Sequence, residues 1–208
     1  MKPNMRPGLL PPEGTMWRGA TIETPPNNKS GHFTGGWGIG ADPQEFEDYY
    51  GQPLQIYRNF NEKSNATLTG DTAWQFIQDG GIIFYSIQPK DSWAEFARGD
   101  KDAEIRKYAR GVASAKPAQI MVPVGYEPDL YINLNEKTAA TPGKARGTVE
   151  DYHAMWERFD LIFKEEGADN AVYILDFSWD VRDNLEFIDL LWPRNVNIQW
   201  LFFNMFQF

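Results

Sequence analysis

The chain has 208 residues, 42% of them hydrophobic, and a formal net charge of -9. This length allows one domain or at most two small ones, and the acidic balance disfavours nucleic acid or an anionic membrane surface as a partner. The sequence has no cysteine and two histidines, His32 and His153, which excludes thiolate chemistry and disfavours a metal centre or a Ser-His triad. No apolar run approaches the roughly 20 residues that span a bilayer.

Residues 1–16 contain four prolines and no hydrophobic period, so we expect a disordered or loosely packed lead-in to a single domain over residues 17–208. In that domain, β-rich runs bounded by turn residues alternate with amphipathic stretches. The predicted strands cover residues 16–22, 54–60, 82–87, 120–124, 171–177 and 196–206. The predicted helices cover residues 42–51, 71–77, 100–115, 148–167 and 185–191.

The alternation of strands and helices predicts an α/β fold with right-handed crossovers and a parallel sheet. Six such units fit either a (β/α) barrel or a doubly wound sheet. No glycine-rich phosphate-binding motif follows the first strand, so a nucleotide is not indicated. We expect no cofactor and no metal.

The fourth predicted strand is followed directly by a carboxylate. Its apolar run, residues 120–124, is typical of a strand buried on both faces, and it stops at Gly125-Tyr126-Glu127-Pro128-Asp129. Glu127 therefore stands where parallel α/β folds place their chemistry. The alternative is an ordinary loop carboxylate. Further polar or aromatic residues lie at or near the ends of the other predicted strands: Glu23, Arg58, Asn59, Asp176, Trp179 and Asn204.

The segment over residues 120–180 resembles glycoside hydrolase family 26, the retaining β-mannanases and related endo-glycanases. Tyr126-Glu127-Pro128-Asp129 looks like that family's fourth-strand His-Glu-Met-Asn, whose Glu is the general acid/base. Residues 152–170 are similar to the family's next helix and the turn after it. Residues 197–206, after Trp192-Pro193, look like its sixth strand.

The resemblance implies a TIM-type (β/α)8 barrel that cleaves a β-linked polysaccharide, with mannan the favoured substrate (mannan endo-1,4-β-mannosidase activity). Glu127 would be the general acid/base of a retaining, two-carboxylate mechanism. The substrate contacts we predict come from Arg58, Tyr126, Asp129, Trp179 and Asn204. Aromatic residues make up 15% of the chain, and some of them could stack on sugar rings.

The chain departs from the family pattern at four places. Tyr126 stands for the family's His, Asp129 for its Asn, and Phe206 for its sixth-strand Tyr. The nucleophilic Glu belongs to the seventh strand, whereas this chain ends with the sixth, so we expect about six of eight units and impaired hydrolysis. The alternative is a non-catalytic carbohydrate-binding protein or a structural remnant of such a barrel.

The expected partner is a polysaccharide or oligosaccharide, with neither nucleic acid nor membrane involved. An incomplete barrel would expose its sixth strand as an apolar edge, so self-association through that strand is also predicted. The family leads us to expect an extracellular or cell-surface location, although no export signal is visible in this sequence.

Overall fold

The computed structural model describes residues 19–21, 47–48, 51, 53–61, 71–132, 145–178, 181 and 185–204. The strands are β1 (Gly19–Thr21), β2 (Ile56–Asn61), β3 (Ile82–Ile87), β4 (Ile120–Pro123), β5 (Ala171–Phe177) and β6 (Trp200–Phe203). The named helices are α2 (Asp71–Gln78), α3 (Trp93–Arg98), α4 (Asp102–Ser114), α5 (Val149–Glu165) and α6 (Glu186–Leu190), with a 3-10 turn η1 (Pro128–Leu130). The predicted lead-in over residues 1–16 lies outside the described residues.

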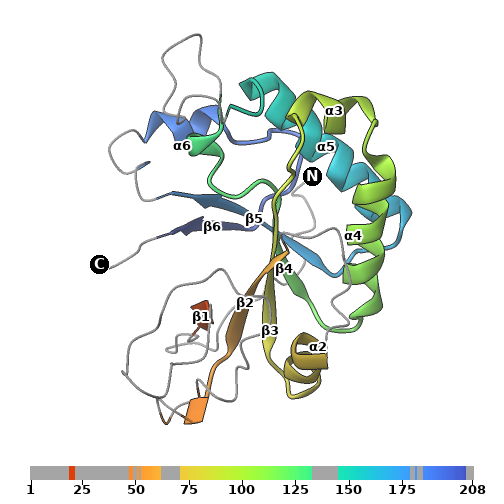
Figure 1. Ribbon diagram of the computed structural model, residues 1–208, viewed down its shortest axis with the longest axis vertical. Coiled ribbons are helices and arrows are strands. Elements are labelled where there is room, and N and C mark those ends of the chain that lie inside the picture. Colours follow the sequence, from red (N-terminus) through yellow and green to blue (C-terminus); the bar gives the residue numbers. More distant parts are fainter. Residues whose placement is uncertain are drawn as a thin grey trace, which may run out of the picture.

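The six strands form one sheet in the order β1-β2-β3-β4-β5-β6, and every neighbouring pair is parallel. Because the order never reverses, the sheet is not doubly wound. Figure 1 shows the strands curling into a half-barrel, with α2, α3, α4 and α5 on the convex side. The predicted α/β class and parallel, barrel-like sheet are confirmed.

The curl brings together side chains of strands that are not neighbours in the sheet. The rings of Phe84 in β3 and Phe202 in β6 lie 5.1 Å apart between their centroids. A small apolar cluster on this inner face consists of Phe84, Met121 and Ile174. The main core lies on the opposite face, where the alternate strand residues pack against the helices. On the inner face, side chains from opposite edges of the curled sheet are thus in contact with one another.

Capping residues define where the helices begin. Thr148 and Asp151 exchange side-chain and backbone hydrogen bonds in a capping box that starts α5, as predicted. A second capping box, between Ser92 and Glu95, starts α3, which ends at Gly99 with φ 91°. The sequence analysis predicted one helix over residues 100–115 and missed α3.

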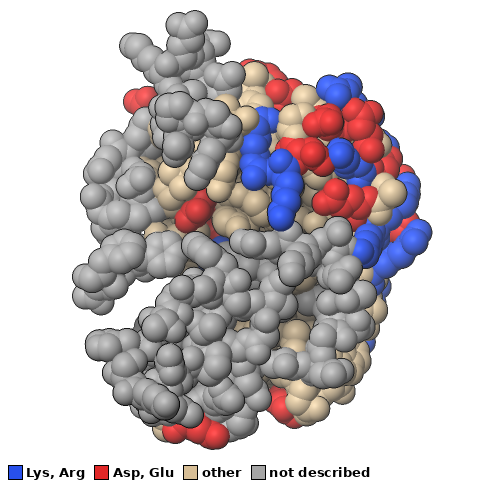
Figure 2. All heavy atoms as spheres, in the orientation of Figure 1, with Lys and Arg blue, Asp and Glu red and all other residues tan. Residues whose placement is uncertain are grey.

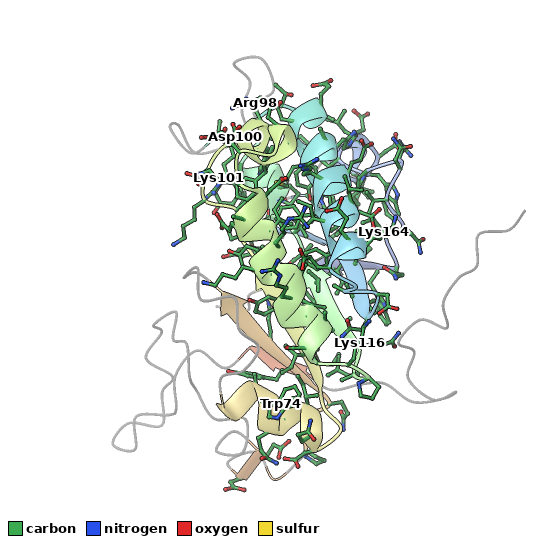
Figure 3. The ribbon with its side chains drawn as sticks, turned by 90° about the vertical axis from the view of Figure 1, so that its right-hand side faces the viewer. Trp74, Arg98, Asp100, Lys101, Lys116 and Lys164 are labelled. Atoms are coloured by element: carbon green, nitrogen blue, oxygen red, sulfur yellow. The ribbon has the colours of Figure 1, made fainter. Side chains whose placement is uncertain are left out.

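Ion pairs link α4 and α5, which lie side by side in Figure 3. Arg106 of α4 reaches Glu165 at 2.6 Å and Glu166 at 2.8 Å. Nε of Arg158 donates to Asp102 at 2.8 Å. Figure 2 shows charges of both signs intermixed over this side of the molecule. In the described part of the chain, no helix is long and apolar enough to cross a membrane.

The sixth strand is shorter than the predicted range over residues 196–206. The backbone N–H of Tyr173 in β5 donates to the Gln199 side-chain oxygen at 2.7 Å, while Gln199 N donates to Tyr173 O at 3.0 Å. A side chain thus takes the place of a backbone acceptor at this point, and the ladder begins only at Trp200. Phe206 lies outside the described residues.

Candidate functional site

Glu127 lies in the turn that leaves the carboxyl end of β4. Val124 forms a parallel bridge with Ile87, Gly125 takes φ 64°, and Glu127 itself has φ 53° and ψ 48°. Its backbone N–H donates to the carbonyl of Asp176 in β5 at 2.6 Å. A left-handed backbone is costly for a residue with a Cβ and is found mostly where the surroundings enforce it. Here the bond to β5 and the prolyl residue that follows hold the turn in place.

The Glu127 carboxyl points over the ends of the strands. Nδ2 of Asn204, the residue after β6, donates to Glu127 Oε1 at 3.0 Å. Glu127 is half-buried. This places Glu127 on the inner side of the curled sheet, at the edge where parallel α/β proteins bind their ligands.

Beneath Glu127 lies a buried ion pair. Arg58 in β2 is 5% exposed and Asp176 in β5 is 1% exposed. Their Nη2 and Oδ2 atoms are 2.6 Å apart. Arg58 also donates from Nε to Ser86 Oγ at 3.0 Å and from Nη1 to Asn204 Oδ1. These bonds satisfy the charges that burial would otherwise leave uncompensated.

Aromatic rings surround the Arg58 guanidinium. Its central carbon lies 4.7 Å from the centroid of Phe84, 5.4 Å from that of Phe202 and 5.6 Å from that of Tyr126. These distances are within the range of cation–π attraction. The rings also exclude water, which strengthens the hydrogen bonds of the ion pair.

Asp129 ties the turn after β4 to the end of β5. Its Oδ1 accepts from the Ser178 backbone N–H at 3.0 Å, and its Oδ2 accepts from the Ser178 hydroxyl. Asp129 is buried, and each oxygen of its carboxylate accepts a bond from Ser178. The arrangement braces the turn that carries Glu127.

Burial raises the pKa of Asp176 to about 7, against the opposing effect of Arg58. The nearby carboxylates of Glu127 and Asp129 add to the upward shift, because like charges disfavour a further ionisation. The Asp176 carboxyl therefore titrates close to neutral pH.

Five of the six predicted site residues lie together in this structure: Arg58, Tyr126, Glu127, Asp129 and Asn204. Trp179 and the strand-end carboxylate Glu23 lie outside the described residues. The sequence analysis noted Asp176 as a strand-end carboxylate but did not pair it with Arg58, and it missed Ser86 and Ser178. An arginine inside a buried strand was the available signal, because such a charge requires a partner.

No group of three or more His, Cys, Asp or Glu side chains among the described residues could hold a metal ion. Comparison with protein-family models and with curated proteins finds no match to this chain.

The backbone of Glu127 gives a first prediction. Glu127→Ala and Glu127→Gly both remove the carboxylate, but only alanine keeps a Cβ at φ 53°. We expect the glycine variant to be more stable than the alanine variant by about 1 kcal/mol in urea unfolding. At Ala113, inside α4, replacement by glycine should instead cost about 1 kcal/mol. Equal stability of the two Glu127 variants would show that the left-handed backbone at this position is not strained by a Cβ.

The buried carboxyl of Asp176 gives a second prediction. Because its pKa in the folded chain lies above the usual 3.8, the folded state binds more protons than the unfolded state between pH 3.8 and about 7. The free energy of unfolding should therefore fall as pH rises through this window, by at most about 1.4 kcal/mol per pH unit from this group.

Urea unfolding at several pH values tests this contribution. Asp176→Asn should lack this pH-dependent contribution, so the difference in unfolding free energy between wild type and Asp176→Asn should change with pH. Asp189→Asn, at an exposed position in α6, should show the same pH dependence as wild type. A difference between wild type and Asp176→Asn that is constant with pH would contradict the raised pKa.

Proposed function

We propose that the described domain is part of a TIM-type (β/α)8 barrel, with about six of its eight units in this chain. We further propose that it acts on a β-linked polysaccharide, with mannan the favoured substrate. The chemistry would be that of a retaining glycosidase resembling glycoside hydrolase family 26. The observation that carries the proposal is the Glu127 carboxyl, held by Asn204 over the carboxyl ends of a curled parallel sheet.

Glu127 takes the role of general acid/base. As the bond between the anomeric carbon and the glycosidic oxygen breaks, Glu127 delivers its proton to that oxygen, so the sugar leaves as an alcohol. After a nucleophile has formed the covalent intermediate, ionised Glu127 takes a proton from the water that hydrolyses it. Tyr126, next in the chain and half-buried, supplies an aromatic face beside this position.

The second carboxylate of a retaining site is not evident among the described residues. Glu127 Oε1 and Asp176 Oδ1 bind the same Asn204 nitrogen at 3.0 and 2.8 Å. The two oxygens are therefore less than about 6 Å apart, close to the separation of a retaining pair. Asp176, however, is buried and bound to Arg58, and Asp129 is bound to Ser178. The resemblance assigns the nucleophile to a seventh strand instead.

This commitment of Asp176 and Asp129 favours a second candidate function, glycan binding without hydrolysis. Both candidates use the carboxyl-end opening of the half-barrel, called the mouth, where Arg58, Tyr126, Glu127 and Asn204 lie. They differ only in whether Glu127 transfers a proton. A small external nucleophile separates them, because azide can attack the anomeric carbon in place of a missing carboxylate. Glu127 would then still have to protonate the leaving oxygen.

The third prediction concerns a β-1,4-manno-oligosaccharide incubated with the chain, with and without azide. We expect cleavage to be slow or undetectable alone and to rise at least about 100-fold with azide, giving an α-mannosyl azide. Glu127→Gln should lose this cleavage and keep binding, measured by calorimetry. An aryl mannoside with a good leaving group should be less affected, because its departure needs no proton.

Glu157→Gln is the matched control, since Glu157 is an exposed carboxylate on α5, and it should behave as wild type. Binding without cleavage under either condition would establish the glycan-binding candidate. Absence of binding to mannan, xylan and mixed-linkage glucan would overturn both candidates. Full cleavage by Glu127→Gln would overturn the role of Glu127.

Self-association through β6 is the fourth prediction. Among the described residues β6 pairs only with β5, and Leu201 is 37% exposed. Sedimentation should show association that weakens in Leu201→Lys, because a lysine on an edge strand opposes strand pairing. Leu161→Lys, on the exposed face of α5, should leave association unchanged. A wild-type chain that sediments as a monomer would contradict this prediction.

A further inference from the structure

Asn204 is the residue on which the polar groups at the mouth converge. It follows β6, its backbone N–H donates to Phe177 O of β5 at 2.8 Å, and its side chain is 7% exposed. The sheet therefore fixes the main chain that leads into Asn204 and its own backbone N–H.

Every hydrogen-bonding group of this amide has a charged partner. Oδ1 accepts from Nη1 of Arg58. Nδ2 donates to Asp176 Oδ1 at 2.8 Å and to Glu127 Oε1 at 3.0 Å. A side-chain amide offers two N–H donors, so both are directed at carboxylates.

The charges of the partners determine the orientation of the amide. A guanidinium only donates, and an ionised carboxylate only accepts. Turning the amide by 180° would place its NH₂ against Arg58, which has no acceptor, and its oxygen against the two carboxyl groups. With both carboxylates ionised, three attractive contacts would become three repulsive ones. The Arg58–Asp176 ion pair thereby selects one orientation, and that orientation presents an N–H to Glu127.

We propose that Asn204 is a positioning residue that fixes the direction of the Glu127 carboxyl and couples it to the buried Arg58–Asp176 ion pair. The catalytic meaning of this role rests on the proposed function of Glu127. The contact itself does not. Asn204 would thus act through Glu127, in addition to the sugar contact predicted for it from the sequence.

Two restraints then act on Glu127 from different strands. β5 holds its backbone through the bond from Glu127 N to Asp176 O, and β6 holds its carboxyl through Asn204. Because the donor engages Oε1, the orientation of the other oxygen is set as well, since the carboxyl group is planar. An acid that must reach a glycosidic oxygen gains rate from such orientation, and a misplacement of about 1 Å can cost about 100-fold.

The competing explanation is that Asn204 only satisfies the buried ion pair, with Glu127 a bystander. The two explanations differ in how the titration of Glu127 responds to the amide. An N–H that donates to an ionised carboxylate favours ionisation, so removal of the donor moves the titration midpoint upward. A purely structural Asn204 would leave that midpoint where it is.

The fifth prediction concerns the chemical shifts of the two groups as pH is varied. NMR on the full chain would follow the ¹³C shift of the Glu127 carboxyl and the ¹⁵N shift of the Asn204 side-chain amide. In wild type, the chemical shifts of the Asn204 NH₂ group should change at the pH at which the Glu127 carboxyl titrates. That change should vanish in Glu127→Gln. An Asn204 amide that does not sense Glu127 would overturn the proposal, and this measurement needs no change at Asn204 itself.

In Asn204→Ala, the Glu127 midpoint should rise by about half to one pH unit. Ser86→Ala is the matched control: it removes a partner of the same Arg58 without touching Glu127, and it should shift the midpoint by less than about 0.2 pH unit. If Asn204→Ala does not fold, Asn204→Ser should give a smaller rise, because one hydroxyl donor remains. An unchanged midpoint in the folded variant, or an equal shift in Ser86→Ala, would overturn the proposal.

Cleavage assays separate this inference from the proposed function. With azide present, Asn204→Ala should lower kcat about 10- to 100-fold with little change in KM, and Asn204→Ser should recover part of the loss. If no variant cleaves any glycan but the NMR responses are as predicted, the proposed function fails while the coupling stands. If cleavage depends on Glu127 but neither kcat nor its midpoint depends on Asn204, the inference fails while the function stands.

Discussion

The ion pair between Arg58 and Asp176 is the buried interaction on which the arrangement of the site depends. The two side chains come from β2 and β5, which are separated by β3 and β4 in the sheet. Their atoms can lie 2.6 Å apart only because the sheet curls. Leaving one charge buried without the other commonly costs about 3–5 kcal/mol, so the pair and the curvature of the sheet depend on each other.

The same pair determines what lies above it. The guanidinium orients the Asn204 amide, the amide orients Glu127, and the backbone of Asp176 holds the turn in which Glu127 lies. The turn is braced a second time by Asp129 and Ser178. The left-handed backbone of Glu127 is therefore maintained by contacts from both ends of the residue. A strained residue that is restrained in this way is typical of a functional position.

Much of the fold could be predicted from the sequence because its signals are local. The limits of β3 and β5 follow from apolar runs with turn residues on both sides, and the start of α5 follows from Thr148 and Asp151. The same reasoning applied to Ser92, Glu95 and Gly99 would have found α3. The late start of the β6 ladder could not be predicted, because it depends on the Gln199 side chain, which accepts the Tyr173 N–H of β5 in place of a backbone carbonyl.

The site was predictable in position but not in its connections. Parallel strands end at one edge, so Arg58, Glu127 and Asn204 were expected to lie near one another. Which of them would bind which depends on side-chain geometry across the curl, and no local pattern carries that information. The Asp176 pairing and the inward direction of the Asn204 amide follow only from the three-dimensional arrangement.

The sequential strand order also bears on how the site assembles during protein synthesis. Each strand pairs with the one made just before it, so the sheet can grow at one edge as the chain emerges from the ribosome. Arg58, Glu127 and Asp176 are all made before Asn204. Until β6 docks, neither the ion pair nor the Glu127 carboxyl has its hydrogen bond with the Asn204 amide. The last described strand to be made thus adds the amide that joins the Glu127 carboxyl to the Arg58–Asp176 ion pair.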